Sequence, residues 1–327
     1  MNQSTTDAAA SHPRRRARRA ILAGLAALAA PLAAAATFAA WFNLRPPPEG
    51  LEVSLGAGAT YSRTVSVEPL AVVHEVRVEL GTPGLEFLVT PSDRSGGRAL
   101  RAATTSAFAR RYDLDVAING DFFDPWHSNG PLDYYPHEGD PVDVQGLAIS
   151  NGLRYGEPGQ DSRALFVSCA GAVGFEAPEE TCQAISGWPL LTGGLINTRD
   201  HDARHPRSAL CLDAARRWLG IFVVDGRQAR YSQGMTLAEL GRHLAARGCW
   251  DAINLDGGGS SVLVLRMDGE IKAVSSPIHT RLPGRERPVA NHLGLRLPRG
   301  QTRAGEGLES EAISDTFPAQ TRSGASR

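Results

Sequence analysis

The sequence predicts an α+β fold: a single domain on a mixed, strand-rich sheet with a few helices, preceded by an N-terminal signal or membrane anchor. Segments with strand patterns outnumber helical ones, and the helical segments stand between strands. The 35 glycines and 21 prolines favour many turns and short strands over a helical bundle. The 327 residues carry a formal net charge of −1, so the overall charge indicates no nucleic-acid partner.

The first 44 residues are typical of a targeting segment. A basic region, 1–19, contains RRRARR and precedes an uncharged, alanine-rich stretch over 20–44. This stretch is long enough to cross a bilayer, which takes about 20 residues, and it predicts either a signal-peptide core or a transmembrane anchor. Both place the rest of the chain outside the cytoplasm, either in the periplasm or on the outer face of the cytoplasmic membrane.

The globular domain is expected over residues 51–298. The proline-rich segment before it, 45–50, is expected to be a stiff linker. The tail after it, 299–327, is polar and poor in aromatic residues, so it is expected to be disordered.

Four cysteines fall within the domain. An even number in an oxidising compartment favours two disulfides. Their spacing suggests Cys169–Cys182 as a local link and Cys211–Cys249 as a longer one, although four cysteines permit three pairings. No C-x-x-C motif or cluster of histidine and cysteine indicates zinc.

The first half of the domain begins with a predicted hairpin. HEVRVEL alternates with period two, and LEFLVT follows after GTPG, which together predict paired strands over 74–90. SAFARRYD, 106–113, is expected to be a helix. It leads into LDVAING, 114–120, which is expected to be a short buried strand.

The second half contains the strongest helical pattern. WLGIFVVDG, 218–226, predicts a buried strand that ends at a turn. TLAELGRHLAARG follows, in which Thr236 and Glu239 form a capping box and Gly248 can end the helix. The helix leads directly into WDAINLD, 250–256, a third buried strand.

Polar residues follow each of these three buried strands. They are Asn119 and Asp121 after the first, Asp225 and Arg227 after the second, and Asn254 and Asp256 at the third. A single Asn-Gly or Asp-Gly is usually a hairpin turn. Three strand ends with such residues favour a functional site, because a rigid sheet can hold side chains at its edge.

The third strand end continues as a run of three glycines and two serines. Successive backbone N–H groups of Gly257, Gly258 and Gly259 can approach an anion closely, and Ser260 adds a hydroxyl donor. Asp256 beside such donors could act as acid, base, nucleophile or metal ligand. No Gly-Lys-Ser/Thr and no G-x-S-x-G accompanies the run, so it is neither a Walker loop nor a nucleophile elbow. The alternative is a plain turn, with exposed glycines remote from the other strand ends.

Two basic stretches complete the candidate residues. RHPRSAL contains Arg204, His205 and Arg207, and RERPVANHLGL contains Arg285, Arg287, Asn291 and His292. An arginine can bind a phosphate through two hydrogen bonds, although each arginine taken alone is expected to be a surface charge. The histidines, with His127 and His137, are expected to be structural or solvent-facing, because no two have metal-ligand spacing.

Six segments in order resemble the phosphodiester glycosidase family, which includes the domain of the lysosomal "uncovering enzyme", N-acetylglucosamine-1-phosphodiester alpha-N-acetylglucosaminidase. They are AINGDFF, GLAISNG, HPRSAL, VVDGR, AINLDGGGSSVLV and RPVANHLGL. The resemblance covers roughly residues 70–297. It implies an exoplasmic hydrolase that splits a sugar from a phosphodiester at the anomeric carbon and, for bacterial members, a link to cell-envelope polysaccharides.

The family pattern can be carried over residue by residue. It matches Asn119 and Gly120, Arg207, Asp225 and Arg227, then Asn254, Asp256, Gly257, Gly258, Gly259 and Ser260, and finally Arg287 and Asn291. The chain departs from it at Asp121, where many relatives carry a small residue, and at Cys211, where glycine is frequent. An insert, 124–145, is rich in His, Tyr and Asp and is expected to form the rim of the pocket, which would alter the substrate.

The first functional hypothesis is an exported hydrolase that cleaves the glycosidic bond of a GlcNAc-phosphodiester-like substrate in cell-envelope glycans. Asp256 and Asp225 are the first candidates for the carboxylates that act at the sugar carbon. Asp121 is the third candidate, with Asn119 beside it. Arg207, Arg227 and the amides of the glycine run would hold the phosphate, with Asn254, Ser260, Arg287 and Asn291 as further binding residues.

Two alternatives remain open. One is a non-catalytic envelope protein that binds a glycan. The other is a metal-dependent phosphodiesterase in which Asp121, Asp124 and Asp256 would bind one divalent cation such as calcium. No other cofactor is expected. The expected partners are a sugar-phosphate or polysaccharide substrate and, if the N-terminal segment is not cleaved, the membrane, with no nucleic acid.

Overall fold

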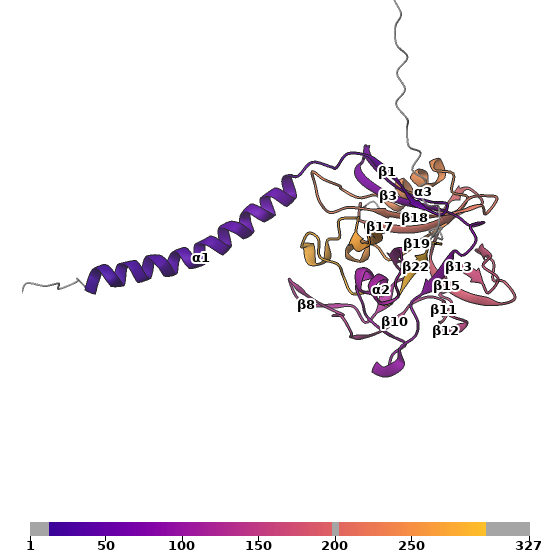
Figure 1. Ribbon diagram of the computed structural model, residues 1–327, viewed down its shortest axis with the longest axis horizontal. Coiled ribbons are helices and arrows are strands. Elements are labelled where there is room, and N and C mark those ends of the chain that lie inside the picture. The colour runs from indigo at the N-terminus through magenta and orange to yellow at the C-terminus, as the bar shows by residue number, and fades with distance from the viewer. Residues whose placement is uncertain (1–12, 198–202, 299–327) are drawn as a thin grey trace, which may run out of the picture.

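A computed structural model describes residues 13–197 and 203–298 (Figure 1). A long helix, α1 (Pro13–Leu44), extends away from a strand-rich domain. Its segment Ile21–Phe38 is long and apolar enough to cross a membrane, and none of it is buried by the domain. The predicted tail and the first 12 residues of the basic region lie outside the described residues.

The larger sheet has twelve strands. Its main path, in spatial order, is β1 (Leu51–Gly56), β2 (Ala59–Val67), β3 (Leu70–Glu79), β18 (Trp218–Val224), β17 (Arg207–Leu212), β19 (Asp251–Asn254), β15 (Thr181–Thr192), β11 (Ala148–Ser150) and β12 (Leu153–Gly156). Three short strands branch from this path: β13 (Arg163–Ser168), β14 (Val173–Gly174) and β16 (Leu195–Ile196).

A second sheet of five strands lies against the first. Its order is β21 (Glu270–Ala273), β20 (Leu263–Met267), β6 (Val116–Asn119), β22 (His292–Arg296) and β4 (Glu86–Val89). A smaller sheet holds β5 (Leu100–Arg101), β10 (Pro141–Val144) and β7 (Phe123–Asp124), and a hairpin holds β8 (His127–Gly130) and β9 (Asp133–Tyr135). The helical segments of the domain are α2 (Thr105–Arg111), α3 (Leu237–Ala246), η1 (Arg94–Gly96), η2 (Gly258–Ser260) and η3 (His279–Arg281).

The two large sheets and the two helices form four layers. Ile221 of the first sheet and Ile118 of the second belong to one core cluster between the sheets. The outer face of the first sheet, including Phe222, packs on Leu240 of α3, and the outer face of the second packs on Phe108 of α2. The central strands are therefore buried on both faces, which explains their continuous apolar runs.

The expected α+β fold, a strand-rich single domain with few helices, is confirmed. Helices stand at SAFARRYD and at TLAELGRHLAARG, and Thr236 and Glu239 form the capping box. All strand pairs among the described residues are antiparallel, so the prediction of mixed sheets is wrong. The helical connection through α3 joins β18 to β19, which flank β17, so these two parallel strands are not neighbours.

The predicted hairpin over 74–90 is also wrong. The strand at its start, β3, pairs with β2 and β18, whereas β4 pairs with β22 in the second sheet. The GTPG turn therefore carries the chain from one sheet to the other. Val76 and Val89 then enter the same core from opposite sides, which alternation within each strand could not reveal.

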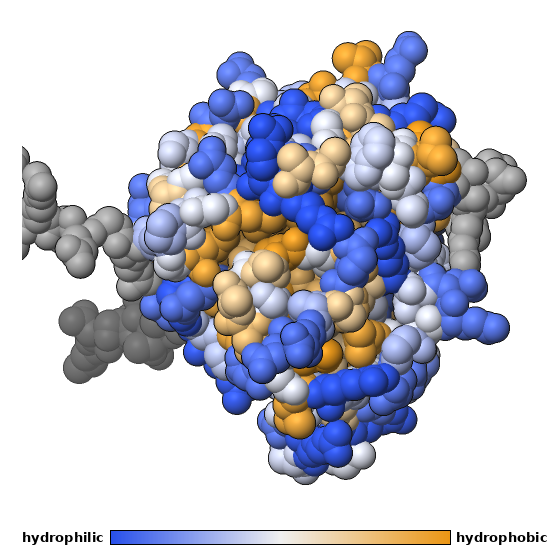
Figure 2. Space-filling view, turned by 90° about the vertical axis from the view of Figure 1, so that its right-hand side faces the viewer, coloured by the Kyte–Doolittle hydropathy of each residue, from blue (hydrophilic) through white to orange (hydrophobic). Residues whose placement is uncertain are grey.

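Both predicted disulfides form. The Cα atoms of Cys169 and Cys182 lie 4.8 Å apart, and those of Cys211 and Cys249 lie 5.7 Å apart. The second disulfide links Cys211, near the end of β17, to the segment between α3 and β19. Two disulfides together with an N-terminal apolar helix are consistent with export through a signal or an anchor. The face of the domain away from α1 is rimmed by hydrophilic residues, with apolar ones gathered in a central hollow (Figure 2).

Candidate active site

The ends of β6 and β19 and the start of β17 meet at one place. The Asn119 side-chain amide donates a hydrogen bond to the main-chain oxygen of Asp256 at 2.7 Å, and its oxygen accepts one from Ser208 Oγ at 2.7 Å. The main-chain N–H of Asp256 donates to the oxygen of Gly120 at 3.0 Å. Asn119 is fully buried, so it joins the three strand ends. A plain turn remote from the other strands is excluded.

Gly258 and Gly259 each face one arginine, and a third arginine lies near Gly257. A Cβ added to Gly257 would lie 3.0 Å from the main-chain oxygen of Pro206 and 4.0 Å from Arg207 Nη1. A Cβ on Gly258 would lie 2.9 Å from Arg227 Nη2, and one on Gly259 would lie 2.6 Å from Arg287 Nη2. Gly258 also has a φ of +64°, which costs other residues strain. The run therefore forms the floor on which three guanidinium groups lie.

This arrangement differs from the expected main-chain anion nest. The N–H of Gly258 donates to the oxygen of Pro206 at 2.9 Å, and the N–H of Ser260 donates to the oxygen of Gly257 at 3.2 Å. These donors stabilise the η2 turn. The space that a side chain at 258 or 259 would take is filled by arginine, so the cationic donors of the site are side chains.

The three arginines are held by main-chain oxygens and histidine nitrogens. Arg207 Nε donates to the oxygen of Met235 at 2.9 Å. Arg287 Nε donates to His279 Nδ1 at 3.2 Å, and Arg227 Nε donates weakly to His205 Nδ1 at 3.4 Å. Within residues 13–197 and 203–298, none of the three forms an ion pair with a carboxylate.

Their mutual repulsion and burial affect their protonation. Burial, with the charge of Arg227, lowers the pKa of Arg207 to about 10. Burial also lowers the pKa values of Arg227 and Arg287; the charge of Arg281 adds to the effect at Arg227, and the charge of Arg227 adds to it at Arg287. All three remain cationic at neutral pH, and three positive charges beside a single carboxylate, that of Asp256, predict an anionic ligand.

Asp256 is the carboxylate beside these arginines. Its Oδ2 accepts a hydrogen bond from Ser260 Oγ at 2.6 Å, and Ser260 Oγ in turn accepts one from Arg287 Nη1 at 3.1 Å. Burial raises the pKa of Asp256, against the opposing influence of Ser260 and Arg287. A carboxylate whose pKa is raised is suited to give or take a proton in catalysis.

Asp121 lies behind Asp256 and is almost fully buried. Its carboxylate accepts hydrogen bonds from Ser186 Oγ at 2.5 Å and from the N–H of Phe122 at 2.8 Å. Burial raises its pKa to about 7, and the charge of Asp256 adds to the rise. The two acids therefore form a coupled pair of which only Asp256 borders the cleft.

The cleft above this floor has a volume of about 1360 Å³. Aromatic side chains form its walls: Phe122 stacks on Trp188 with centroids 4.4 Å apart, and Trp126 meets Tyr134 edge-on at 5.7 Å. Trp126 and Tyr134 belong to the insert over 124–145, whose expected place at the rim is confirmed. Trp188 and the 280–283 segment also line the cleft, and no sequence motif had indicated either.

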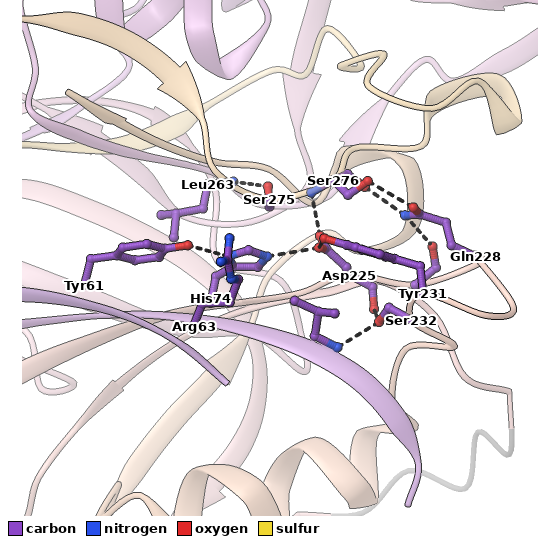
Figure 3. Close-up of polar contacts among 12 residues, drawn as sticks. Tyr61, Arg63, His74, Asp225, Gln228, Tyr231, Ser232, Leu263, Ser275 and Ser276 are labelled. Carbon is purple, nitrogen blue, oxygen red and sulfur yellow. Dashed lines mark hydrogen bonds and ion pairs between the residues drawn. The ribbon is translucent and has the colours of Figure 1, made fainter. Parts of the chain in front are cut away.

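Asp225 does not border the cleft, contrary to its predicted place at the sugar carbon. His74 Nε2 lies 3.0 Å from its Oδ2, which also accepts from Tyr231 at 3.1 Å, and the N–H of Ser276 donates to Oδ1 at 2.7 Å (Figure 3). Asp225 is 2% exposed. It fixes the turn that carries Arg227, because Asp225 and Arg227 are only two residues apart, and it reaches no ligand itself.

Asn254, Asn291 and His292 are buried framework residues. Asn254 Nδ2 donates to the oxygen of Leu255 at 2.9 Å, and Asn291 Oδ1 accepts from the N–H of Asp121 at 2.9 Å. His292 lies between Thr90 and Ala103, and burial lowers its pKa to about 3. Asn291 therefore positions Asp121 and does not contact a ligand.

The remaining candidates are peripheral. His127 and His137 are exposed, and Arg204 forms an ion pair with Glu239. Asp124, proposed as a metal ligand, lies at the cleft edge near Arg98, at 3.5 Å. Among the described residues, no three His, Cys, Asp or Glu side chains stand close enough to hold a metal ion, so Asp121, Asp124 and Asp256 do not form a ligand set.

Comparison with known proteins gives a family and a fold. The family model described as phosphodiester glycosidase matches residues 112–296. The catalytic domain of zebrafish N-acetylglucosamine-1-phosphodiester alpha-N-acetylglucosaminidase, auto-inhibited by its pro-peptide, is 22% identical. The match covers 76% of this chain and 87% of that one, with a TM-score of 0.51. At this identity, the likeness shows the fold alone.

A second solved structure, a hypothetical protein from Synechocystis, is 15% identical. The match covers 76% of this chain and 64% of that one, with a TM-score of 0.49. A search of functionally curated proteins gives no match.

Proposed function

The chain belongs to the phosphodiester glycosidase family, and from that premise we propose that it hydrolyses a sugar-1-phosphodiester at the bond between the anomeric carbon and the phosphate oxygen. The observation that carries the proposal is the placement of Arg207, Arg227 and Arg287 over the glycine run, next to Asp256. The arginines suit the phosphate of such a substrate, and the carboxylate suits its anomeric carbon.

The arginines would bind the phosphate. Guanidinium groups pair with phosphate oxygens in planar, two-point hydrogen bonds, and burial strengthens the attraction. As the bond to the sugar breaks, negative charge grows on the departing phosphate, which becomes a monoester. Three fixed cations stabilise that charge, so the leaving group needs little help from a general acid.

Asp256 would act at the anomeric carbon. It would either take a proton from the attacking water or attack the carbon itself, and the configuration of the released sugar distinguishes the two. In both cases the oxygen of water ends on the sugar, and the original bridging oxygen leaves with the phosphate. Asp121, held in place by Asn291 and Ser186, would lie behind Asp256, whose charge contributes to the raised pKa of Asp121.

The aromatic walls would bind the sugar. Trp126, Tyr134 and the stacked pair of Phe122 and Trp188 provide apolar faces on which a pyranose ring can lie. The zebrafish enzyme is named for N-acetylglucosamine, so a GlcNAc-1-phosphodiester is the first substrate to test. Export by α1 would bring the domain to the cell envelope, where glycans joined through phosphodiesters are the expected targets.

Hydrolysis in oxygen-18 water tests the proposal. The full chain in detergent is incubated with the methyl phosphodiester of GlcNAc-1-phosphate. Mass spectrometry then measures the masses of the sugar and phosphate products to locate the oxygen-18. We expect the label in the sugar. Label in the phosphate would overturn the proposal in favour of a phosphodiesterase, and binding without any product would favour a glycan-binding protein.

A further inference from the structure

The membrane-type helix borders the cleft. Phe38 of α1, 53% exposed, lies at the mouth of the cleft that contains Asp256. The apolar segment Ile21–Phe38 ends at that same residue. Its 18 residues measure about 27 Å along a helix, close to the roughly 30 Å of a hydrocarbon core. If α1 spans the membrane over this segment, the bilayer surface lies at the mouth of the cleft.

The domain is tied to the end of this helix. Arg45, the first residue after α1, donates through Nη2 to Gln228 Oε1 at 2.7 Å and to Ser276 Oγ at 2.5 Å. Its guanidinium lies 3.8 Å from the centre of the Tyr231 ring. Tyr231 and Ser276 are partners of Asp225, so the tether is fixed to the cluster that holds Arg227 in the cleft. The domain therefore has little freedom to turn away from the helix.

The rim beside the helix has the character of a membrane-facing surface. The exposed apolar side chains Trp126 and Leu132 lie on the insert over 124–145, at either end of β8, and Leu282 lies on the 280–283 segment. The guanidinium of Arg285 joins the two regions by donating to the oxygen of Leu132 at 2.9 Å. Arg281 is exposed between them. Apolar side chains with arginine favour the boundary between headgroups and acyl chains. Figure 1 shows β8 on the side of the domain from which α1 extends.

We propose that the cleft opens onto the membrane in which α1 is embedded, and that the alcohol of the substrate's phosphodiester is a lipid of that membrane. The reaction itself rests on the proposed function. The sugar enters the cleft, its phosphate reaches the three arginines, and the lipid chain stays in the bilayer. Water adds to the anomeric carbon, the free sugar leaves, and the lipid phosphate remains in the membrane.

A pair of matched substrates tests the proposal. The full chain is reconstituted in vesicles of phosphatidylcholine with phosphatidylglycerol and given GlcNAc-1-phosphate esters of hexadecanol or of methanol. A second protein carries a flexible spacer of about 20 Gly and Ser residues between Leu44 and Arg45, with an end-to-end distance of roughly 25 Å. We expect the spacer to lower kcat/KM for the hexadecyl ester about tenfold, because both proteins stay on the vesicle but only one holds the cleft at its surface. The rate on the methyl ester should stay within about twofold.

Single substitutions at exposed leucines provide the control. Leu132→Asp should lower turnover of the hexadecyl ester several-fold and spare the methyl ester, whereas Leu153→Asp, equally exposed on the distant strand β12, should change neither. Equal effects on the two esters, or none from the spacer, would overturn the proposal. Failure to hydrolyse either ester would instead refute the proposed function. In that case, an environment-sensitive fluorescent dye attached to Leu132→Cys still tests the membrane contact. A blue shift of its emission on vesicles supports the inference, and no shift overturns it.

Discussion

Asp225 and Asp256 look alike in the sequence and have opposite surroundings in the structure. Each follows a buried apolar strand and precedes glycine. Both oxygens of Asp225 accept hydrogen bonds from the framework, and the side chain is closed off from solvent. Asp256 borders the cleft, where three guanidinium groups lie near it without carboxylate partners of their own.

The difference distinguishes a carboxylate whose hydrogen bonds are all made within the protein from one that is available to a ligand. Around Asp225, the donors of His74, Tyr231 and Ser276 match the acceptors, so the cluster is complete without a ligand. Around Asp256, positive charge exceeds negative charge, so the site becomes balanced only when an anion enters. The same strand-Asp-Gly pattern therefore produces one framework residue and one candidate catalytic residue.

Removing the carboxylate of Asp256 should have the largest effect. We expect Asp256→Asn to lower kcat on a GlcNAc-1-phosphodiester on the order of 10³-fold or more, with the melting temperature unchanged or raised, because a costly buried charge is lost. Turnover assays with differential scanning calorimetry measure both. Asp268→Asn, in an exposed turn, is the control. An Asp256→Asn enzyme with full turnover would remove Asp256 from the reaction.

For Asp225, we expect the substitution to lower the stability of the fold. Asp225→Ala leaves a buried histidine and a tyrosine without their partner, and breaking such a buried cluster costs about 3–5 kcal/mol. Urea denaturation of the variant should show this loss, whereas Glu270→Ala, which removes the exposed ion pair with Lys272, should leave the stability nearly unchanged. If Asp225→Ala is as stable as the parent but inactive, Asp225 belongs with Asp256 and the contrast between them fails.

Asp121 should make the stability depend on pH. Its folded-state pKa of about 7 exceeds the unfolded value of 3.8, so the folded protein holds a proton that the unfolded chain releases. Its stabilising contribution is full below pH 4 and declines as pH rises through 7, with a loss of about 2 kcal/mol between pH 5 and 7. Urea titrations across this range should show the slope, and Asp121→Asn should remove it. An equal slope in the variant would assign it to other groups.

Gly258→Ala should lower activity less than Asp256→Asn does, and it should also cost some stability. The positive φ should cost about 1–2 kcal/mol, and the new methyl group would displace Arg227, which we expect to raise KM about tenfold, near 1.4 kcal/mol. Gly269→Ala is the matched control, because Gly269 also has a positive φ, of +79°, but faces open space. It should lose similar stability and keep its KM. Equal kinetics in both variants would show that the glycine run is only a turn.

The sequence was informative where a local rule decides the outcome. The capping box of Thr236 and Glu239 located α3, and continuous apolar runs located the buried strands. The motif order brought Asn119, Arg207 and Asp256 into one hypothesis, and the structure places them together.

What the sequence could not supply depends on contacts between distant segments. The partner of Asp225, His74, lies 151 residues earlier in the chain, and no local signal joins them. The hairpin over 74–90 failed because alternation within a strand does not say which sheet the strand joins. Trp188 gave no signal either, because a tryptophan in an apolar strand resembles an ordinary core residue.

The apposition of three glycines and three arginines has a consequence for how such a chain can evolve. Gly259 can gain a side chain only if the guanidinium of Arg287 moves, because a Cβ there would lie 2.6 Å from its Nη2. We therefore expect substitutions at 258 and 259 to occur together with substitutions at 227 and 287. A larger residue at a glycine position would accompany a shorter side chain in place of the facing arginine. Each such exchange would remove one positive charge from the floor. A lineage could thus move from anionic to neutral ligands in discrete steps, one glycine at a time, without altering the sheets that hold the floor.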